Sequence, residues 1–189
     1  TETIQAVSSK IFLPLTVGGG IRDEDAAAAA VDAGADKVSL NTAALKTPAI
    51  ISTLAKRYGS QAVIVAIDAK RRNNGFAVYV RSGTADAAQD AVVWAREAES
   101  RGAGEILLTS MDRDGTKTGF DCEMTLAVSD AVNIPVIASG GAGTFQHFTD
   151  VFTHGHADAA LAASIFHYAD SSVSELKQYL HGQGLPIRL

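Results

Sequence analysis

The sequence has one cysteine, no net positive charge and no long apolar run, and each shortage excludes a class of protein. Cys122 cannot form an internal disulfide, so we expect a reducing compartment, the cytoplasm. The net charge is −5, so the chain lacks the excess of basic residues that is typical of a nucleic-acid-binding protein. No apolar run reaches the ~18 residues of a membrane span. We therefore expect neither a nucleic-acid nor a membrane partner.

The start of the chain also lacks familiar signals. Residues Thr1–Val7 carry no basic n-region of a signal peptide and no initiator methionine. Their pattern resembles the last turns of an amphipathic helix, so we expect that further residues of a larger protein precede Thr1. No linker or low-complexity stretch follows, which predicts a single domain over residues 1–189.

Short apolar runs alternate with longer helical patterns along the whole chain. The predicted strands are Leu13–Val17, Lys37–Leu40, Val63–Ile67, Glu105–Thr109, Pro135–Ala138 and Ala159–Ala162. The predicted helices are Glu24–Ala33, Ala49–Tyr58, Ala88–Arg101, Glu123–Val132, Phe145–Phe152 and Val173–Leu180. Most of the strands are apolar on both faces, as in a buried parallel sheet. Six βα units in series predict an α/β fold with right-handed crossovers.

A polar, turn-rich stretch interrupts this alternation after the third predicted strand. Residues Arg71–Gly75 are followed by a short β-type run, Phe76–Val80. A hairpin is expected there.

The chain contains an internal repeat. Pro14–Gly20 is echoed by Pro135–Gly141, about 121 residues later, and Gly34–Ala43 is echoed by His156–Ile165. This offset is roughly half of a typical ~250-residue barrel. The repeat predicts a barrel with pseudo-twofold symmetry.

Glycine clusters follow a strand in each repeat, and they are candidate anion sites. Backbone N–H groups of Gly18–Gly20 and of Gly140–Gly143 can approach a phosphate closely, next to a helix N-terminus. The following loops, Asn41-Thr42 and Ala163-Ser164, add hydroxyl and N–H groups. These glycines could instead only make tight turns, but two matched clusters favour a ligand with a phosphate at each end.

Carboxylates after two other strands are candidates for chemistry. Asp68 ends an apolar strand, at the mouth where barrel enzymes place their reactions, and burial there would suit it to acid–base catalysis. It could otherwise cap a helix or pair with Lys70 or Arg71. In the loop Ser110–Thr116, Asp112 or Asp114 could orient a polar substrate and Gly115 could approach a phosphate, or the loop could be an Asx turn with an internal ion pair.

The remaining polar candidates are weaker. Lys37 and Glu105 begin strands and so lie at the opposite face, which normally serves stability. His154 and His156 are two apart in a loop, without the further ligands that a metal site needs. No metal site is predicted.

Two stretches, Leu40–Ala44 and Ala66–Arg71, together with the glycine loops and Arg113–Thr116, resemble a known family. It is the cyclase subunit of imidazole glycerol phosphate synthase, from histidine biosynthesis, and the likeness runs from end to end. The sister isomerase of the pathway shares the glycine loops and the Arg-Asp-Gly-Thr run, whereas the first two stretches favour the cyclase.

The resemblance implies a fold, an activity and a set of residues. Such cyclases are (βα)8 barrels that use ammonia from a glutaminase partner. They convert a bis-phosphorylated ribulosyl nucleotide to imidazole glycerol phosphate and aminoimidazole carboxamide ribotide, without a cofactor. By motif, the catalytic residue is Asp68; the phosphate and substrate residues are Gly20, Asn41, Thr42, Asp114, Gly115, Gly140, Gly141, Ala163 and Ser164; the ammonia gate includes Lys37 and Glu105; and Asp36 faces the glutaminase.

Family members carry two βα units before the point that matches Thr1, so the chain is expected to hold units three to eight of an incomplete TIM-type barrel. Those two units supply the second catalytic aspartate, so we expect little activity from residues 1–189 alone, with phosphate affinity retained. Open barrel edges predict self-association. Three readings stay open: an enzyme completed by assembly, a catalytically inactive phosphate-binding module, or one part of a protein whose other part is a separate chain.

Overall fold

The structure, a computed structural model that describes residues 1–80, 83, 85–167 and 171–189, is organised around a sheet of six parallel strands. In spatial order these are β1 (Thr16–Gly18), β2 (Lys37–Leu40), β3 (Val63–Arg72), β6 (Glu105–Ser110), β7 (Val136–Ser139) and β8 (Ala159–Leu161). The spatial order equals the chain order, as in a barrel wall. Within the described residues β1 and β8 do not pair with each other, so the barrel is incomplete. The predicted α/β class with about six βα units is confirmed.

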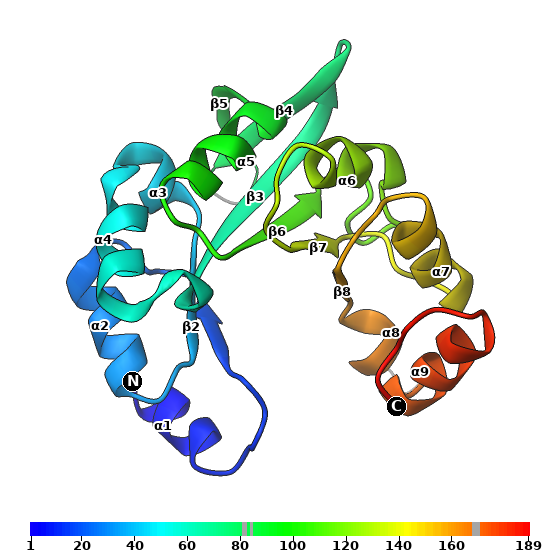
Figure 1. The fold of residues 1–189 in the computed structure, drawn as a ribbon, viewed down its shortest axis with the longest axis horizontal. Coiled ribbons are helices and arrows are strands. Elements are labelled where there is room, and N and C mark those ends of the chain that lie inside the picture. Colours follow the sequence, from blue (N-terminus) through cyan, green and yellow to red (C-terminus); the bar gives the residue numbers. More distant parts are fainter. Residues whose placement is uncertain (81–82, 84, 168–170) are drawn as a thin grey trace.

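The helices lie along the outside of this curved sheet (Figure 1). They are α1 (Glu2–Ser8), α2 (Glu24–Asp32), α3 (Thr42–Lys46), α4 (Ala49–Tyr58), α5 (Ala91–Ser100), α6 (Cys122–Ser129), α7 (Phe145–Thr153), α8 (Ser164–His167) and α9 (Val173–Gly182), with a 3-10 turn at Ser60–Ala62. Side-chain caps determine where several of the helices begin. Asp23, for example, accepts the N–H of Ala26 at 2.8 Å and caps α2.

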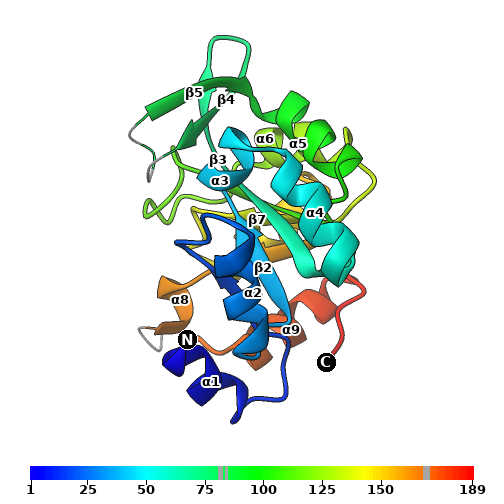
Figure 2. The same cartoon turned by 90° about the vertical axis from the view of Figure 1, so that its left-hand side faces the viewer.

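The predicted hairpin is present as β4 (Gly75–Val80) paired with β3, and it continues into β5 (Ala85–Asp90). This arm lies at the end of the molecule opposite α1 and α9 (Figures 1 and 2). The prediction that a helix begins at Ala88 was wrong. Ala88 belongs to β5, and Asp90 accepts the N–H groups of Val92 and Val93, so α5 starts only at Ala91.

The first strand is also shorter than predicted, since it begins at Thr16 and not at Leu13. Leu13 is largely exposed, and Pro14 has no N–H to donate to a ladder. The short helices α3 and α8 were not predicted. Each follows a strand within a few residues and is too short to show a helical period.

Burial alternates along the strands, so their two faces differ. Val38 and Leu40 of β2 are buried beneath the helices, whereas Lys37 and Ser39 face the inner side and are only partly covered. The same alternation runs through β6 and β7. The expectation of strands buried on both faces was therefore wrong, because the helices cover the outer face only. Polar side chains on the inner face are left available for a ligand.

Candidate functional site

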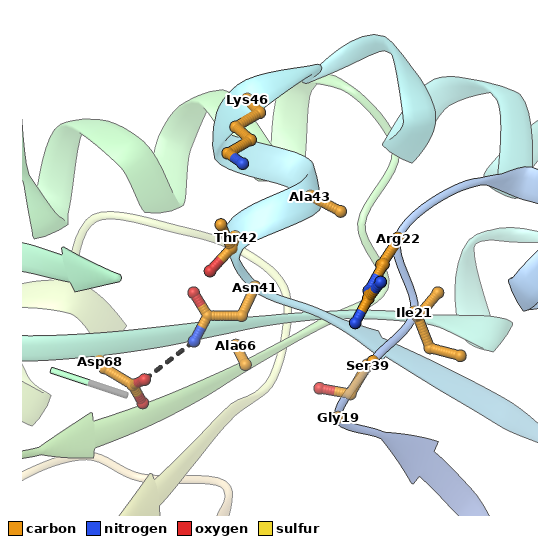
Figure 3. Close-up of a pocket in the computed structure, with 11 residues that line it drawn as sticks. Gly19, Ile21, Arg22, Ser39, Asn41, Thr42, Ala43, Lys46, Ala66 and Asp68 are labelled. Carbon is orange, nitrogen blue, oxygen red and sulfur yellow. Dashed lines mark hydrogen bonds between the residues drawn. The ribbon is translucent and has the colours of Figure 1, made fainter. Parts of the chain in front are cut away.

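A concave pocket of about 690 Å³ opens at the carboxyl ends of β1, β2 and β3. Its walls come from the glycine loop after β1, the start of α3, and the inner face of β3 (Figure 3). The lining residues are Gly19, Gly20, Ile21, Arg22, Ser39, Asn41, Thr42, Ala43, Lys46, Ala66 and Asp68. We call this the first pocket. It brings together Gly20, Asn41, Thr42 and Asp68, the predicted residues of the first repeat and the predicted catalytic carboxylate.

The glycine loop of the first pocket needs backbone angles that favour glycine. Gly19 and Gly20 have φ values of +76° and +92°, and a Cβ built on either would meet nothing within 4 Å. The loop backbone is therefore open to the pocket, and a phosphate oxygen could reach it. The loop leads directly into α2, whose N-terminal end carries a positive partial charge.

Two cations of the first pocket were missed in the sequence. Arg22 lies just after the glycine loop, and Lys46 ends α3; both side chains line the pocket (Figure 3). Within the described residues neither forms a salt bridge. A basic residue two positions after a glycine cluster was a usable signal for Arg22, whereas Lys46 reaches the pocket only because α3 turns the chain back.

Asp68 lies on the inner face of β3, where its carboxylate Oδ2 accepts a hydrogen bond of 2.9 Å from Asn41 Nδ2 (Figure 3). Burial raises the pKa of Asp68 above its usual range; the Asn41 hydrogen bond opposes this rise, and the nearby charge of Asp114 adds to it. A carboxyl group whose pKa is raised toward neutrality suits acid–base chemistry. The alternatives of a helix cap or a partner for Lys70 or Arg71 are not what is found, since Lys70 Nζ lies 4.7 Å from the Tyr79 ring centroid and the Arg71 guanidinium binds Glu123.

A second pocket, of about 210 Å³, opens at the carboxyl ends of β7 and β8. Its lining residues are Asp114, Gly115, Lys117, Ser139, Gly140, Gly141, Ala142, Leu161, Ala162, Ala163 and Ser164. Gly140, Gly141, Ala163 and Ser164 of the second repeat gather here with Asp114 and Gly115, whereas Gly143 of the predicted glycine cluster does not line the pocket. Lys117 and Ser139 were not predicted. The volume matches a phosphate-sized group better than a whole nucleotide.

Two of the three loops that line the second pocket, those after β6 and β7, are packed tightly together. Gly119 N–H donates to the Gly141 carbonyl at 2.8 Å. Gly140 and Gly141 have φ values of +90° and +102°. A Cβ on Gly141 would lie 2.2 Å from the Gly119 oxygen. Here the glycines are required both for backbone angle and for close approach, so they are more than loose turns.

The two acidic residues predicted in the loop after β6 have different roles. Asp112 accepts the backbone N–H of Arg71 at 2.8 Å, and the Arg71 guanidinium binds Glu123 through both of its terminal nitrogens. Asp114 instead lines the second pocket. Asp112 therefore ties this loop to the end of β3, while Asp114 is the residue placed to meet a ligand.

Charged groups at the opposite edge of the sheet hold the strands together. Lys37 and Glu105 form an ion pair on the inner face, and each is about one-fifth to one-quarter exposed. Asp36 accepts the N–H of Leu15 at 2.8 Å, and its repeat equivalent Asp158 accepts the N–H of Val136 at 2.9 Å. Each repeat thus has an equivalent carboxylate, and this carboxylate fixes the start of one strand against the next. Asp36 remains exposed at this edge.

The described part of the chain has neither a metal-binding cluster nor a membrane-spanning helix. No group of three or more His, Cys, Asp or Glu side chains there could hold a metal ion. His156 pairs with Asp130 at 3.0 Å. No helix in residues 1–80, 83, 85–167 and 171–189 is long and apolar enough to cross a membrane.

Comparison with known proteins gives consistent matches over the chain. The family model described as "Histidine biosynthesis protein" matches residues 1–172. The chain is 60% identical over 188 residues to the imidazole glycerol phosphate synthase subunit HisF of Acidobacterium capsulatum, an alignment that covers all of this chain and 74% of that protein. Subunits of the same name from Chlorobium luteolum and Campylobacter concisus are 55% and 54% identical, again over all of this chain and over 75% and 74% of theirs.

Proposed function

Because the chain belongs to the histidine biosynthesis protein family, among the HisF subunits of imidazole glycerol phosphate synthase, we propose that it carries out the cyclase reaction of that enzyme. In this reaction a ribulosyl nucleotide with two phosphates and ammonia give imidazole glycerol phosphate and aminoimidazole carboxamide ribotide. No cofactor takes part. The observation that carries the proposal is a half-buried carboxyl group, Asp68, at the same edge of the sheet as two glycine-lined pockets.

The two pockets would hold the two phosphates of the substrate. Gly20, Thr42 and the cation Arg22 serve one end, and Gly141 and Ser164 serve the other. The remaining phosphate and substrate residues are Asn41, Asp114, Gly115, Gly140 and Ala163. A substrate anchored at both ends has its reacting centre fixed between them, which lowers the entropic part of the barrier.

Asp68 would act as the acid–base group at that centre. Its raised pKa keeps a larger fraction of the carboxyl protonated near neutral pH than an exposed aspartate would have, so it can both give and take a proton. The Asn41 amide orients the carboxylate through Oδ2 and leaves Oδ1 for the substrate. Asn41 is thereby proposed to serve the catalytic group as well as the first phosphate.

Ammonia would enter from the opposite edge of the sheet. The Lys37–Glu105 pair lies on the inner face there and is proposed to be part of a charged gate. Exposed Asp36 is proposed to face a glutaminase subunit. We propose that the described chain forms one unit that corresponds to the third to eighth βα units of the barrel.

Turnover with free ammonium and the ribulosyl nucleotide tests the proposal. Asp68→Asn should lower the rate by at least about 10²-fold, because general acid–base groups contribute roughly 10²–10⁴-fold. Asp130→Asn is a matched control, since this carboxylate is exposed and forms an ion pair with His156, away from both pockets. Equal rates for wild type and Asp68→Asn would overturn the assignment of Asp68.

For residues 1–189 assayed alone, we further propose weak turnover with phosphate binding retained. β1 and β8 are open edges within the described structure, and Phe12, Leu13 and Leu161 are exposed next to them. Such edges favour self-association. Light scattering at micromolar concentration tests this, and a stable monomer would contradict it. Phosphate binding without turnover would favour the alternative of an inactive, self-associating binding module.

A further inference from the structure

The side chain of His147 fixes the glycine loop of the second pocket from behind. His147 lies in the first turn of α7, and its Nδ1 accepts the N–H of Gly143 at 3.1 Å and the N–H of Thr144 at 3.2 Å. The ring also lies against Gly119, where an added Cβ would be 3.5 Å from His147 Cδ2. His147 therefore contacts two of the three loops that build this pocket, those after β6 and β7.

The imidazole of His147 must be neutral in this arrangement of hydrogen bonds. Two N–H groups point at Nδ1, so Nδ1 must present its lone pair and the ring hydrogen must be on Nε2. His147 is at position N3 of a capping box, three residues after the N-cap Thr144, where Glu or Gln is usual. His147 performs the same task as a carboxylate there without bringing a negative charge.

A second capping box in the same chain shows the usual form. Before α9, Glu175 accepts the N–H of Ser172 at 2.7 Å, and this hydrogen bond holds the pKa of Glu175 below its usual range, so the cap is an anion. Neither Ser172 nor Glu175 lines either pocket. A charged cap is tolerated where no anion binds.

The balance of charge in the second pocket explains why a neutral cap is needed at α7. Its lining contains one cation, Lys117, and one carboxylate, Asp114. The first pocket, by contrast, has two cations, Arg22 and Lys46, with one carboxylate, Asp68, in its lining, and there a further carboxylate, Asp23, does cap the following helix. A carboxylate at residue 147 would leave the second pocket with a negative surplus opposite a phosphate.

We propose that His147 is a positioning residue for phosphate binding in the second pocket, because it holds the glycine loop in its binding shape as an uncharged acceptor. The inference rests on the proposed function, which assigns a phosphate to this pocket. It predicts that the residue at this position is selected for hydrogen-bond acceptance without charge, rather than for helix capping alone.

The test is an NMR titration of the full chain with inorganic phosphate at about pH 8, where imidazoles are neutral. The amides of Gly141 and Ser164 report the second pocket, and those of Gly20 and Thr42 report the first. The variants are His147→Gln, His147→Glu and His147→Ala, with Glu175→Gln as the control capping box. Thermal unfolding is measured for each variant.

We expect His147→Gln to bind phosphate in the second pocket within about threefold of wild type, since Gln keeps an uncharged acceptor. His147→Glu should unfold near the wild-type temperature but bind about tenfold more weakly there, because of charge repulsion. His147→Ala should lose both binding and stability, and Glu175→Gln should leave binding unchanged. The first pocket should bind equally in all of them.

Two results overturn the inference: His147→Glu binding phosphate as tightly as wild type, or His147→Gln binding as weakly as His147→Ala. If wild type shows no phosphate-dependent shifts at Gly141 or Ser164, the proposed function fails first, and this inference fails with it. If wild type binds phosphate in the second pocket but the His147 variants do not follow the predicted order of affinity, the inference about His147 fails while the proposed function stands.

Discussion

Adding one methyl group at equivalent positions of the two repeats should have very different effects. Gly20 and Gly141 occupy matching places in the two glycine loops, with φ values of +92° and +102°. Their surroundings differ. A Cβ on Gly20 would meet nothing within 4 Å, whereas one on Gly141 would lie 2.2 Å from the Gly119 carbonyl oxygen and 3.0 Å from Arg113 Cβ.

The loss of stability in these variants has two parts, backbone strain and steric overlap of the new methyl group. Both Gly→Ala changes force a side chain into a left-handed backbone region, at about 1–2 kcal/mol. Gly141→Ala adds overlap with a backbone atom, since ordinary contact begins near 3.4 Å and the oxygen is at 2.2 Å. Overpacking of this kind costs a further ~1–3 kcal/mol. For a chain of this size ~1 kcal/mol lowers Tm by about 2–4 °C.

Thermal unfolding of the two variants, followed by circular dichroism, checks the reasoning. Gly20→Ala should lower Tm by about 2–8 °C, and Gly141→Ala should lower it by about 2–12 °C more. Gly20→Ala should nevertheless weaken phosphate binding in the first pocket, because its methyl group occupies the open space above the loop. Equal melting temperatures for the two variants would refute the argument from close approach.

Three further perturbations follow from the same structure. The pKa of Asp68 is raised in the folded state, so wild-type stability falls as pH rises from its ordinary value of 3.8 through the folded value. Asp68→Asn should therefore be more stable than wild type at pH 7 and lose that advantage below about pH 3.8, as measured by urea unfolding at each pH. Asp158→Ala removes the acceptor of the Val136 N–H and should cost about 1–2 kcal/mol in the same assay, whereas no loss would mean that water replaces it. Lys37→Met and Glu105→Leu, alone and combined, should show a coupling energy of about 1–2 kcal/mol in a double-mutant cycle, and a value near zero would remove the pair as a stabilising contact.

The sequence was most informative about the functional site where the signal was local. Asp68 was predicted to end a strand because five apolar residues precede it. That strand in fact continues to Arg72 in the hairpin with β4, but its parallel pairing with β6 ends at Ala69, so Asp68 still lies near the carboxyl edge of the parallel sheet. Both glycine loops could be placed because they repeat. The role of Asn41 could not be read in the same way. It looked like a phosphate residue, yet its amide also binds Asp68, 27 positions away.

Errors in the fold arose where two local preferences competed. The alanine-rich stretch near Ala88 favours a helix, but its backbone pairs with β4, and Asp90 ends that pairing by capping α5. Pairing with a neighbouring strand overrides a weak helical propensity.

The sequence by itself determined the series of βα units, the twofold repeat and the glycine loops, because side-chain periodicity and the backbone freedom of glycine act over a few residues. The tertiary structure decided which distant groups meet. It brings Lys46 into the lining of the first pocket, ties Asp112 to the backbone of Arg71, and sets the ring of His147 behind the second glycine loop. These contacts depend on strand register and on how the loops pack against one another, and neither is encoded in any single stretch of the chain.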